Sequence, residues 1–186
     1  MKLVCLLEER SAKEVLKVIL PKILPQGVFF ETIAFEGKRD LTDKLQRRIQ
    51  HWQGNEDVFL VLMDQDGANC VAAKNGLRNI IEETDKAGRT LVRIACHELE
   101  SFFLGDLAAV EQGLGISGLS RQQNNRKYKV PDNLANAPEE LKKLTKNKYQ
   151  KISGSRSIAP FLKIDGSNMS TSFNNLVRGI KKLVEE

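Results

Sequence analysis

The sequence is poor in residues that cross-link or anchor a protein. Its three cysteines, Cys5, Cys70 and Cys96, are an odd number without zinc-type spacing, so we expect reduced thiols and a reducing compartment. No stretch approaches the roughly 20 apolar residues of a membrane span. The five apolar residues that follow Lys2 are too few for the core of a signal peptide. We therefore expect a cytoplasmic protein with no membrane partner.

Several catalytic motifs are missing as well. The chain has no GxxxxGK(S/T) and no GxGxxG, which argues against an intrinsic ATPase and against a dinucleotide-dependent enzyme. No serine or threonine has a histidine and an acid at the spacing of a nucleophile motif. The two tyrosines, Tyr128 and Tyr149, both lie in a basic segment, which disfavours a topoisomerase-type nucleophile and a base-stacking platform. Hydrolysis is therefore favoured over strand transfer.

What the sequence does have is an alternation of apolar strands and amphipathic helices. With 41% hydrophobic residues, a chain of 186 residues can bury a core without metals or disulfides, and one domain is expected. The order predicts an α/β fold with a central, mostly parallel sheet of about four strands flanked by helices. The weaker run 28–35 is expected at a sheet edge. The predicted strands are 3–7, 28–35, 58–63 and 91–96, and the predicted helices are 12–24, 41–52, 71–87, 99–110, 138–144 and 172–184.

Composition divides the single domain 1–186 into three parts. Residues 1–112 form the α/β core, residues 113–156 form a loop-rich basic insertion, and residues 157–186 end in the last helix. Gly88 is expected to end the helix 71–87. Ser170 or Ser172 is expected to cap the helix that closes the chain.

Positive charge is concentrated in the insertion. Between residues 114 and 156 there are ten lysines and arginines against three acids, so this stretch carries +7 and the remainder −2 of the net +5. Such a segment suits a polyanion such as DNA or RNA, with Arg126, Lys127 and Lys129 as candidate phosphate contacts. The alternative is a solvated, partly mobile insertion.

The most informative feature is the run Asp64-Gln65-Asp66-Gly67, which directly follows the apolar strand 58–63. Ligands bind at the carboxyl ends of strands in open α/β sheets, and alternate residues of an extended segment point to the same side. Asp64 and Asp66 can therefore present two carboxylates to one Mg²⁺ or Mn²⁺ ion.

Acids also follow two other predicted strands. Glu8 and Glu9 follow the first strand, and Glu98 and Glu100 follow the fourth. Neighbouring strands lie about 4.8 Å apart, so carboxylates at their ends can share one cation, which also relieves their mutual repulsion. The alternative is that each acid caps the helix that follows it. For the three pairs together we favour a metal site.

Three further residues are candidates for the same site. His97 lies among the acids and is a possible proton carrier, because an ordinary histidine changes its charge near neutral pH; the alternative is a surface or capping histidine. Lys74, in the helix after Asp66, is placed either to reach a metal-bound phosphate or to face solvent. Ser153-Gly-Ser-Arg156 forms either a phosphate-binding loop that uses Arg156 or a simple turn.

These motifs carry a family resemblance. Leu6-Leu-Glu-Glu-Arg-Ser11, Leu20-Pro-Lys-Ile-Leu24 and Val61-Leu-Met-Asp-Gln-Asp-Gly67 resemble the Toprim domain of topoisomerases, primases and overcoming-lysogenization-defect nucleases. Arg93-Ile-Ala-Cys-His-Glu-Leu-Glu-Ser-Phe-Phe-Leu-Gly-Asp106 and Ser153-Gly-Ser-Arg-Ser-Ile-Ala-Pro160 are similar to the small bacterial Toprim-like family of domain of unknown function 4276. The resemblance spans nearly the whole chain and implies a Toprim/Rossmann-like sheet.

The resemblance also implies roles for individual residues. Glu8 matches the glutamate that acts as general acid or base, and Asp64 and Asp66 match the Asp-x-Asp pair that holds magnesium. Glu9 and Ser11-Ala12 depart from the family's usual Glu-Gly and Thr-Glu. The expected function is a Mg²⁺-dependent nuclease in phage defence or nucleic-acid processing. The alternative is a non-catalytic Toprim-derived subunit that binds nucleic acid or a protein partner such as an ATPase or a toxin.

Overall fold

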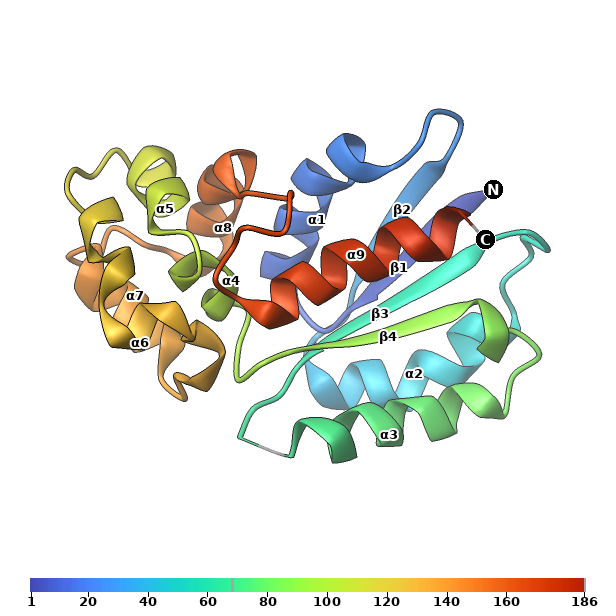
Figure 1. The fold of residues 1–186 in the computed structure, drawn as a ribbon. Coiled ribbons are helices and arrows are strands. Elements are labelled where there is room, and N and C mark those ends of the chain that lie inside the picture. Colours follow the sequence, from blue (N-terminus) through green and yellow to red (C-terminus); the bar gives the residue numbers. More distant parts are fainter. Residues whose placement is uncertain (68, 186) are drawn as a thin grey trace.

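The computed structural model describes residues 1–67 and 69–185, and a four-stranded sheet lies at its centre (Figure 1). The strand order is β2-β1-β3-β4, and every neighbouring pair is parallel. This confirms the predicted α/β fold and the edge position of the run 28–35. The strands are β1 (Lys2–Leu7), β2 (Phe29–Ala34), β3 (Val58–Asp64) and β4 (Thr90–Ala95).

Helices cover both faces of the sheet. Apart from Lys2 and Asp64 at their ends, the two central strands are apolar, and every residue of β3 is buried, as expected for a parallel strand covered on both sides. One face is covered by α1 (Arg10–Ile23) and α9 (Thr171–Glu185), and the other by α2 (Lys38–Gln50) and α3 (Cys70–Glu82) (Figure 1).

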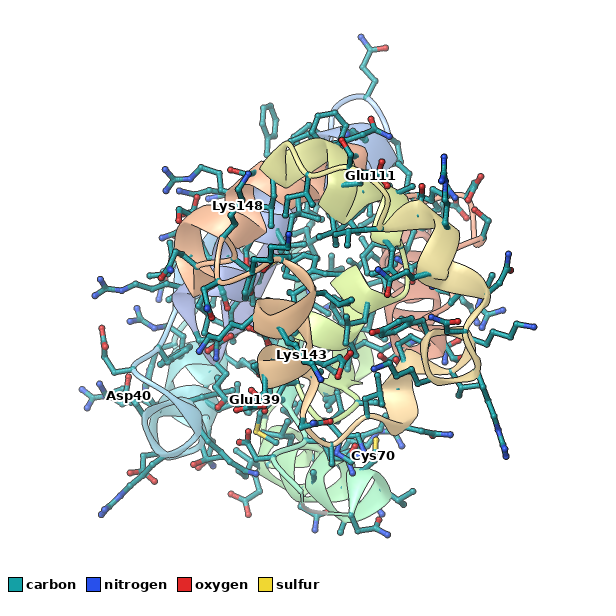
Figure 2. All side chains as sticks on the ribbon, turned by 90° about the vertical axis from the view of Figure 1, so that its left-hand side faces the viewer. Asp40, Cys70, Glu111, Glu139, Lys143 and Lys148 are labelled. Carbon is teal, nitrogen blue, oxygen red and sulfur yellow. The ribbon has the colours of Figure 1, made fainter. Side chains whose placement is uncertain are left out.

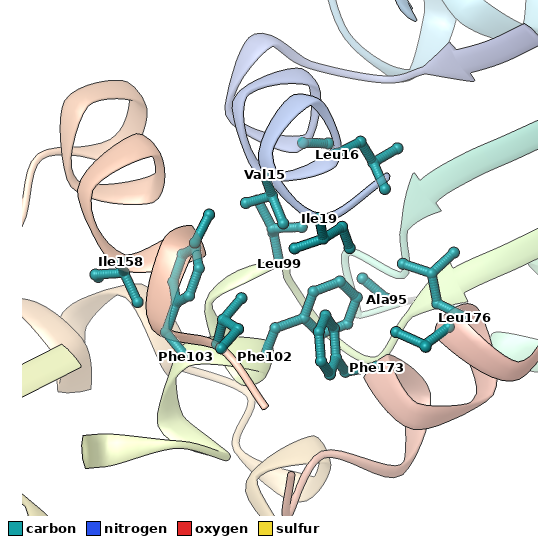
Figure 3. Close-up of a cluster of buried hydrophobic side chains, with 14 of the residues drawn as sticks. Val15, Leu16, Ile19, Ala95, Leu99, Phe102, Phe103, Ile158, Phe173 and Leu176 are labelled. Carbon is teal, nitrogen blue, oxygen red and sulfur yellow. The ribbon is translucent and has the colours of Figure 1, made fainter. Parts of the chain in front are cut away.

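The larger core lies on the α1 and α9 face and continues beyond the sheet. Val15 and Ile19 of α1 lie there with Phe102 and with Phe173 of α9 (Figure 3). The rings of Phe102 and Phe173 are tilted, with centroids 5.1 Å apart. The same buried cluster extends to Ile158, so the second half of the chain shares its core with the sheet.

Short helices gather at the carboxyl ends of the strands (Figure 1). The segment 113–156 contains more helix than its sequence indicates, because its few apolar residues pack into the hydrophobic core and stabilise the helices. Tyr128 and Tyr149, for example, are each 1% exposed. Seen from this side, charged side chains such as Glu139, Lys143 and Lys148 project outward around the helices (Figure 2). The helices are α4 (Glu100–Leu104), α5 (Leu107–Leu114), α6 (Arg126–Lys129), α7 (Ala137–Leu144) and α8 (Lys151–Ile158), with 3₁₀ turns at Ala87–Arg89, Ser120–Asn124, Pro131–Asn133 and Ala159–Phe161.

The helix predicted over 99–110 is divided in two at Gly105-Asp106. A Cβ at Gly105 would overlap Asn168 and lie 2.6 Å from the backbone nitrogen of Ser170, so only glycine allows that segment to pack there. Asp106 then begins α5, because its Oδ1 accepts a hydrogen bond from the N–H of Ala109 at 3.2 Å.

Two other helix ends were predicted with different success. The helix expected over 71–87 ends earlier, since α3 stops at Glu82 and Gly88 lies in a separate 3₁₀ turn. The cap of the last helix is confirmed: Ser170 Oγ accepts from the N–H of Phe173 at 3.2 Å. Among the helices of the described residues, none combines the length and the apolar character that crossing a bilayer requires.

Candidate functional site

The carboxyl ends of three adjacent strands bring acidic side chains together. Glu8 and Glu9 follow β1 directly, and Asp64 is the last residue of β3. Glu100 is the first residue of α4, which follows β4. Because β1, β3 and β4 are neighbours in the sheet, these segments end side by side. We call Glu8, Glu9, Asp64 and Glu100 the acidic cluster.

Asp64 is the member on which the other charges converge. It is 6% exposed, and its backbone N–H donates to Glu8 Oε2 at 2.9 Å, which ties the end of β3 to the end of β1. Burial, followed by the charges of Glu9, Glu8 and Glu100, raises the pKa of Asp64 well above its ordinary value. A positive charge placed here would therefore be strongly stabilised.

Glu100 has one carboxylate oxygen that is buried without a partner. The residue is 0% exposed, and the hydroxyl of Tyr149 donates to its Oε1 at 2.9 Å. Its Oε2 has no hydrogen-bond partner among the described residues. Burial raises the pKa of Glu100 above its ordinary value. A buried, unpartnered carboxylate oxygen is costly unless a ligand satisfies it.

Lys151, the first residue of α8, supplies an ammonium to the cluster. Its Nζ lies 2.6 Å from Glu9 Oε2, and the hydroxyl of Ser11 donates to the other oxygen of Glu9. Although burial lowers it, the pKa of Lys151 is raised on balance by the hydrogen bond to Glu9 and by the charges of Glu9, Glu100 and Asp64. The lysine therefore stays protonated beside the carboxylates.

Tyr149 and Lys151 belong to the site although no sequence pattern points to them. Lys151 is one of ten basic residues in the stretch 114–156, and nothing in the adjacent sequence distinguishes it from the others. Glu9 is evident in the sequence as an acid after the first strand, but nothing near it in the sequence indicates that it pairs with Lys151.

Asp66 and Glu98 lie at the rim of the acidic cluster. Asp66 has a left-handed backbone with φ 51°, which aspartate tolerates, and its Oδ2 lies 4.0 Å from Lys38 Nζ. Glu98 is half-buried, and burial followed by the charge of Glu100 raises its pKa. Both are more accessible than Asp64 and Glu100.

His97 contributes through its backbone. Its N–H donates to Gln65 Oε1 at 3.1 Å, and its carbonyl accepts from the N–H of Asp66 at 3.0 Å. A third bond, from the N–H of Gln65 to the carbonyl of Ala95 at 3.1 Å, continues the β3–β4 pairing beyond the strands. These contacts hold the loops after β3 and β4 against each other. The predicted role of the imidazole as a proton carrier stays a prediction.

The donor set fits a hard divalent cation. All the candidate ligands are carboxylates, which is the chemistry that Mg²⁺ and Mn²⁺ prefer, and Glu100 offers a buried oxygen without a partner. Within residues 1–67 and 69–185, no three acidic, histidine or cysteine side chains already converge on one metal-ligating point. Binding would therefore require the carboxylates to draw closer together.

Two of the predicted phosphate contacts form ion pairs within the chain. Lys127 Nζ lies 2.5 Å from Glu140 Oε1, and Arg156 Nε lies 2.5 Å from Glu14 Oε2. The segment 153–156 lies inside α8, so it is neither a turn nor a phosphate-binding loop. Arg156 thus joins α8 to α1.

The other three basic candidates lie on two different helices. Arg126 and Lys129 are exposed on α6. Lys74 is half-buried on α3, where burial and the charges of Arg78 and Arg93 lower its pKa. Its surroundings are therefore basic, in contrast to the acidic cluster.

Comparison with known proteins supports the fold. Residues 7–181 match the family described as Domain of unknown function (DUF4276). No curated protein matches the chain. Among solved structures, the C-terminal region of the OLD protein of Xanthomonas campestris pv. campestris is similar over 98% of this chain and 95% of that chain, with a TM-score of 0.52 and 14% identity. At this identity the likeness concerns the fold.

Proposed function

This chain belongs to the DUF4276 family, and we propose from its acidic cluster that it is a divalent-metal-dependent nuclease that hydrolyses nucleic-acid phosphodiesters. The proposal rests on one observation: Oε2 of Glu100 is buried without a partner in the acidic cluster, which also contains Asp64. The resemblance to the Toprim domain supports the same activity, and the similarity to the C-terminal region of an OLD protein supports the fold on which the site is built.

The available oxygens distinguish metal ligands from other members of the cluster. Both oxygens of Glu9 are engaged, one by Ser11 and one by Lys151. Among the described residues, Glu100 keeps one carboxylate oxygen without a partner, and Asp64 is the other strongly buried carboxylate of the cluster. These two would be the inner ligands, and Asp66 and Glu98 would complete the set from the rim. When bound, Mg²⁺ stabilises charge on a scissile phosphate and lowers the pKa of a water molecule.

Glu8 is the residue that accepts the proton from the attacking water. One of its oxygens is fixed by the N–H of Asp64 at 2.9 Å, which leaves the other for a solvent molecule. Burial raises the pKa of Glu8 above its ordinary value, partly offset by that hydrogen bond, and the charges of Asp66 and Glu9 raise it further. A carboxylate whose pKa moves toward neutrality is a better base for this step.

Lys151 is the residue that contacts the phosphate. It is exposed, remains protonated and is held by Glu9, so its ammonium is accessible and positioned before a substrate arrives. A fixed positive charge beside a reacting phosphate stabilises the charge that develops in the transition state.

The proposal is tested by metal binding and cleavage measured on the same variants. Mn²⁺ and Mg²⁺ are titrated calorimetrically into the wild type, Asp64→Asn and Glu100→Gln, and each protein is assayed on labelled single- and double-stranded DNA and RNA. Asp43→Asn is the matched control, because Asp43 is an exposed aspartate on α2.

We expect both site variants to lose metal binding and cleavage, and the control to keep both. Cleavage that survives in Asp64→Asn would overturn the proposal. Metal binding by the wild type without cleavage of any of the four substrates would instead favour a non-catalytic subunit that works with a partner.

A further inference from the structure

A second charged region lies along β4 and is basic. Lys74 and Arg78 of α3, Arg93 of β4 and Arg178 of α9 are close enough to affect one another's ionisation. Burial, followed by the charges of Arg78 and Arg178, lowers the pKa of Arg93. None of the four forms an ion pair with a carboxylate in the part of the chain that the structure describes. Four cations gathered without acids repel one another, and an anion would relieve this.

Hydrogen bonds to two backbone carbonyls hold the side chain of Arg93 in place. Arg93 extends from the edge strand β4 toward α9, where its Nε donates to the carbonyl of Asn175 at 3.1 Å. Nη1 donates to the carbonyl of Val92 at 3.1 Å. A Cβ at Gly179, in the interior of α9, would overlap Nη2 of Arg93. Glycine in a helix interior is less stable than alanine, so α9 loses some stability at the position where it makes room for the guanidinium.

A groove of about 450 Å³ runs beside this guanidinium. Arg93 and Lys74 line it together with Cys70, Cys96 and the one acid Asp132. That acid is already engaged: Asp132 Oδ2 accepts from the N–H of Ser172 at 2.7 Å, and Oδ1 accepts from the hydroxyl of Ser170 at 2.6 Å. The groove therefore offers free positive charge and no free acid.

The groove lies between the loop that follows β4 and the basic helix α6. Cys96 directly precedes His97 and Glu98, so one end lies next to the rim of the cluster. Val130 and Asn133 line this groove and also line a second hollow with Arg126 and Lys127. A chain of phosphates leaving the acidic cluster would meet lysine and arginine side chains along this route.

We propose that this groove, which Lys74 and Arg93 line and beside which Arg78 and Arg178 lie near Arg93, binds the phosphodiester backbone of the nucleic-acid strand that enters the acidic cluster; the inference rests on the proposed nuclease function. Arg93 anchors one phosphate with its fixed guanidinium, which presents N–H groups in a planar fork. The other three side chains contact neighbouring phosphates through charge.

Binding is measured without cleavage. Fluorescence anisotropy follows a labelled 20-nucleotide single strand, once as DNA and once as RNA, in EDTA at several salt concentrations. The variants are Lys74→Gln with Arg178→Gln, which change one residue that lines the groove and one exposed residue beside it, and Arg93→Gln, which removes the anchor. Arg47→Gln with Arg48→Gln is the control, since it removes the same charge from the exposed end of α2.

We expect the double variant in the groove to raise Kd at least tenfold and to lower the slope of log K against log salt by about 0.7 for each phosphate that the variant no longer neutralises. Arg93→Gln should raise Kd by a similar or larger factor, and the control should change it less than twofold. An equal loss in the control, unchanged binding by the groove variants, or no binding of DNA or RNA by the wild type would overturn the groove.

The groove and the nuclease can fail separately. A wild type that binds DNA through the groove yet cleaves nothing with Mg²⁺ would overturn the nuclease and keep the groove. Cleavage that depends on Asp64, together with an unchanged KM in the double groove variant, would overturn the groove and keep the nuclease.

Discussion

The ammonium of Lys151 lies 2.6 Å from Glu9 Oε2, and this ion pair joins the helical second half of the chain to the end of β1. Lys151→Gln should lower the cleavage rate by about 10²–10³-fold, because it removes a fixed charge that stabilises the transition state. Calorimetric Mn²⁺ binding should persist, since lysine is no metal ligand here. Lys148→Gln, an exposed lysine of the same segment, is the control. Equal loss of metal binding and cleavage would contradict this role.

Stability without metal should fall as pH rises. The pKa values of Asp64, Glu100, Glu8 and Glu98 are raised above their ordinary 3.8 for aspartate and 4.5 for glutamate. The folded chain therefore holds more protons than the unfolded chain above about pH 4. As the pH rises further, each of these groups lowers the stability of the folded protein until the pH passes the pKa of that group in the folded state. Urea unfolding in EDTA should show a lower midpoint at pH 7.5 than at pH 5.5. Added Mg²⁺ should reduce the difference, and a rising midpoint in EDTA would refute the expectation.

Asp64→Asn should stabilise the metal-free protein while it abolishes metal binding. The substitution removes a buried charge that burial and three neighbouring carboxylates disfavour. We expect a gain on the order of 1–3 kcal/mol at pH 7.5, since a tenfold change in a proton equilibrium corresponds to about 1.4 kcal/mol. Thermal unfolding in EDTA measures it, with Asp43→Asn expected within about 0.5 kcal/mol of the wild type. Destabilisation by Asp64→Asn would show that the charge is not unfavourable there.

The two tyrosines of the second half provide a matched pair. Tyr149 donates to the fully buried Glu100, and Tyr128 donates to Glu140, which also has Lys127 at 2.5 Å. Tyr149→Phe should cost about 1–3 kcal/mol in urea unfolding, because it leaves a buried acceptor unpaired. Tyr128→Phe should cost less than about 1 kcal/mol. A larger loss at Tyr128 would contradict this order.

Two glycines test how closely α5 and α8 approach. A Cβ at Gly113 of α5 would lie 2.6 Å from the Cα of Ile158, whereas at Gly76 of α3 nothing lies within 4 Å. Gly113→Ala should therefore destabilise the protein by about 1–3 kcal/mol. Gly76→Ala should stabilise it by about 0.5–1 kcal/mol. Urea unfolding of both variants checks the prediction, and equal effects would refute the close approach.

Local patterns were enough to predict the sheet and the acids at its edge. Apolar runs such as 58–63 have one structural explanation, a buried strand, and the acids that follow them must lie at the carboxyl edge. Glu8, Asp64 and Glu100 meet there because their strands are neighbours.

The rest depends on contacts between distant segments. Lys151 reaches Glu9, and Tyr149 reaches Glu100, only because α8 packs on α1 and α5. The division of the helix 99–110 likewise depends on a segment around Asn168 that packs on Gly105. Nothing in the sequence around Arg93 indicates that its guanidinium packs against Gly179 of α9.

The position of Lys151 in the chain gives the site an order of assembly. During synthesis the carboxylates of β1, β3 and α4 leave the ribosome well before α8, so an incomplete chain exposes a rim of repelling acids without its ammonium. A chain cut between the core and α8 would be in the same state. If the protein is the nuclease proposed above, cleavage would reach its full rate only after α8 has docked, so unfinished copies would act only weakly on nucleic acid.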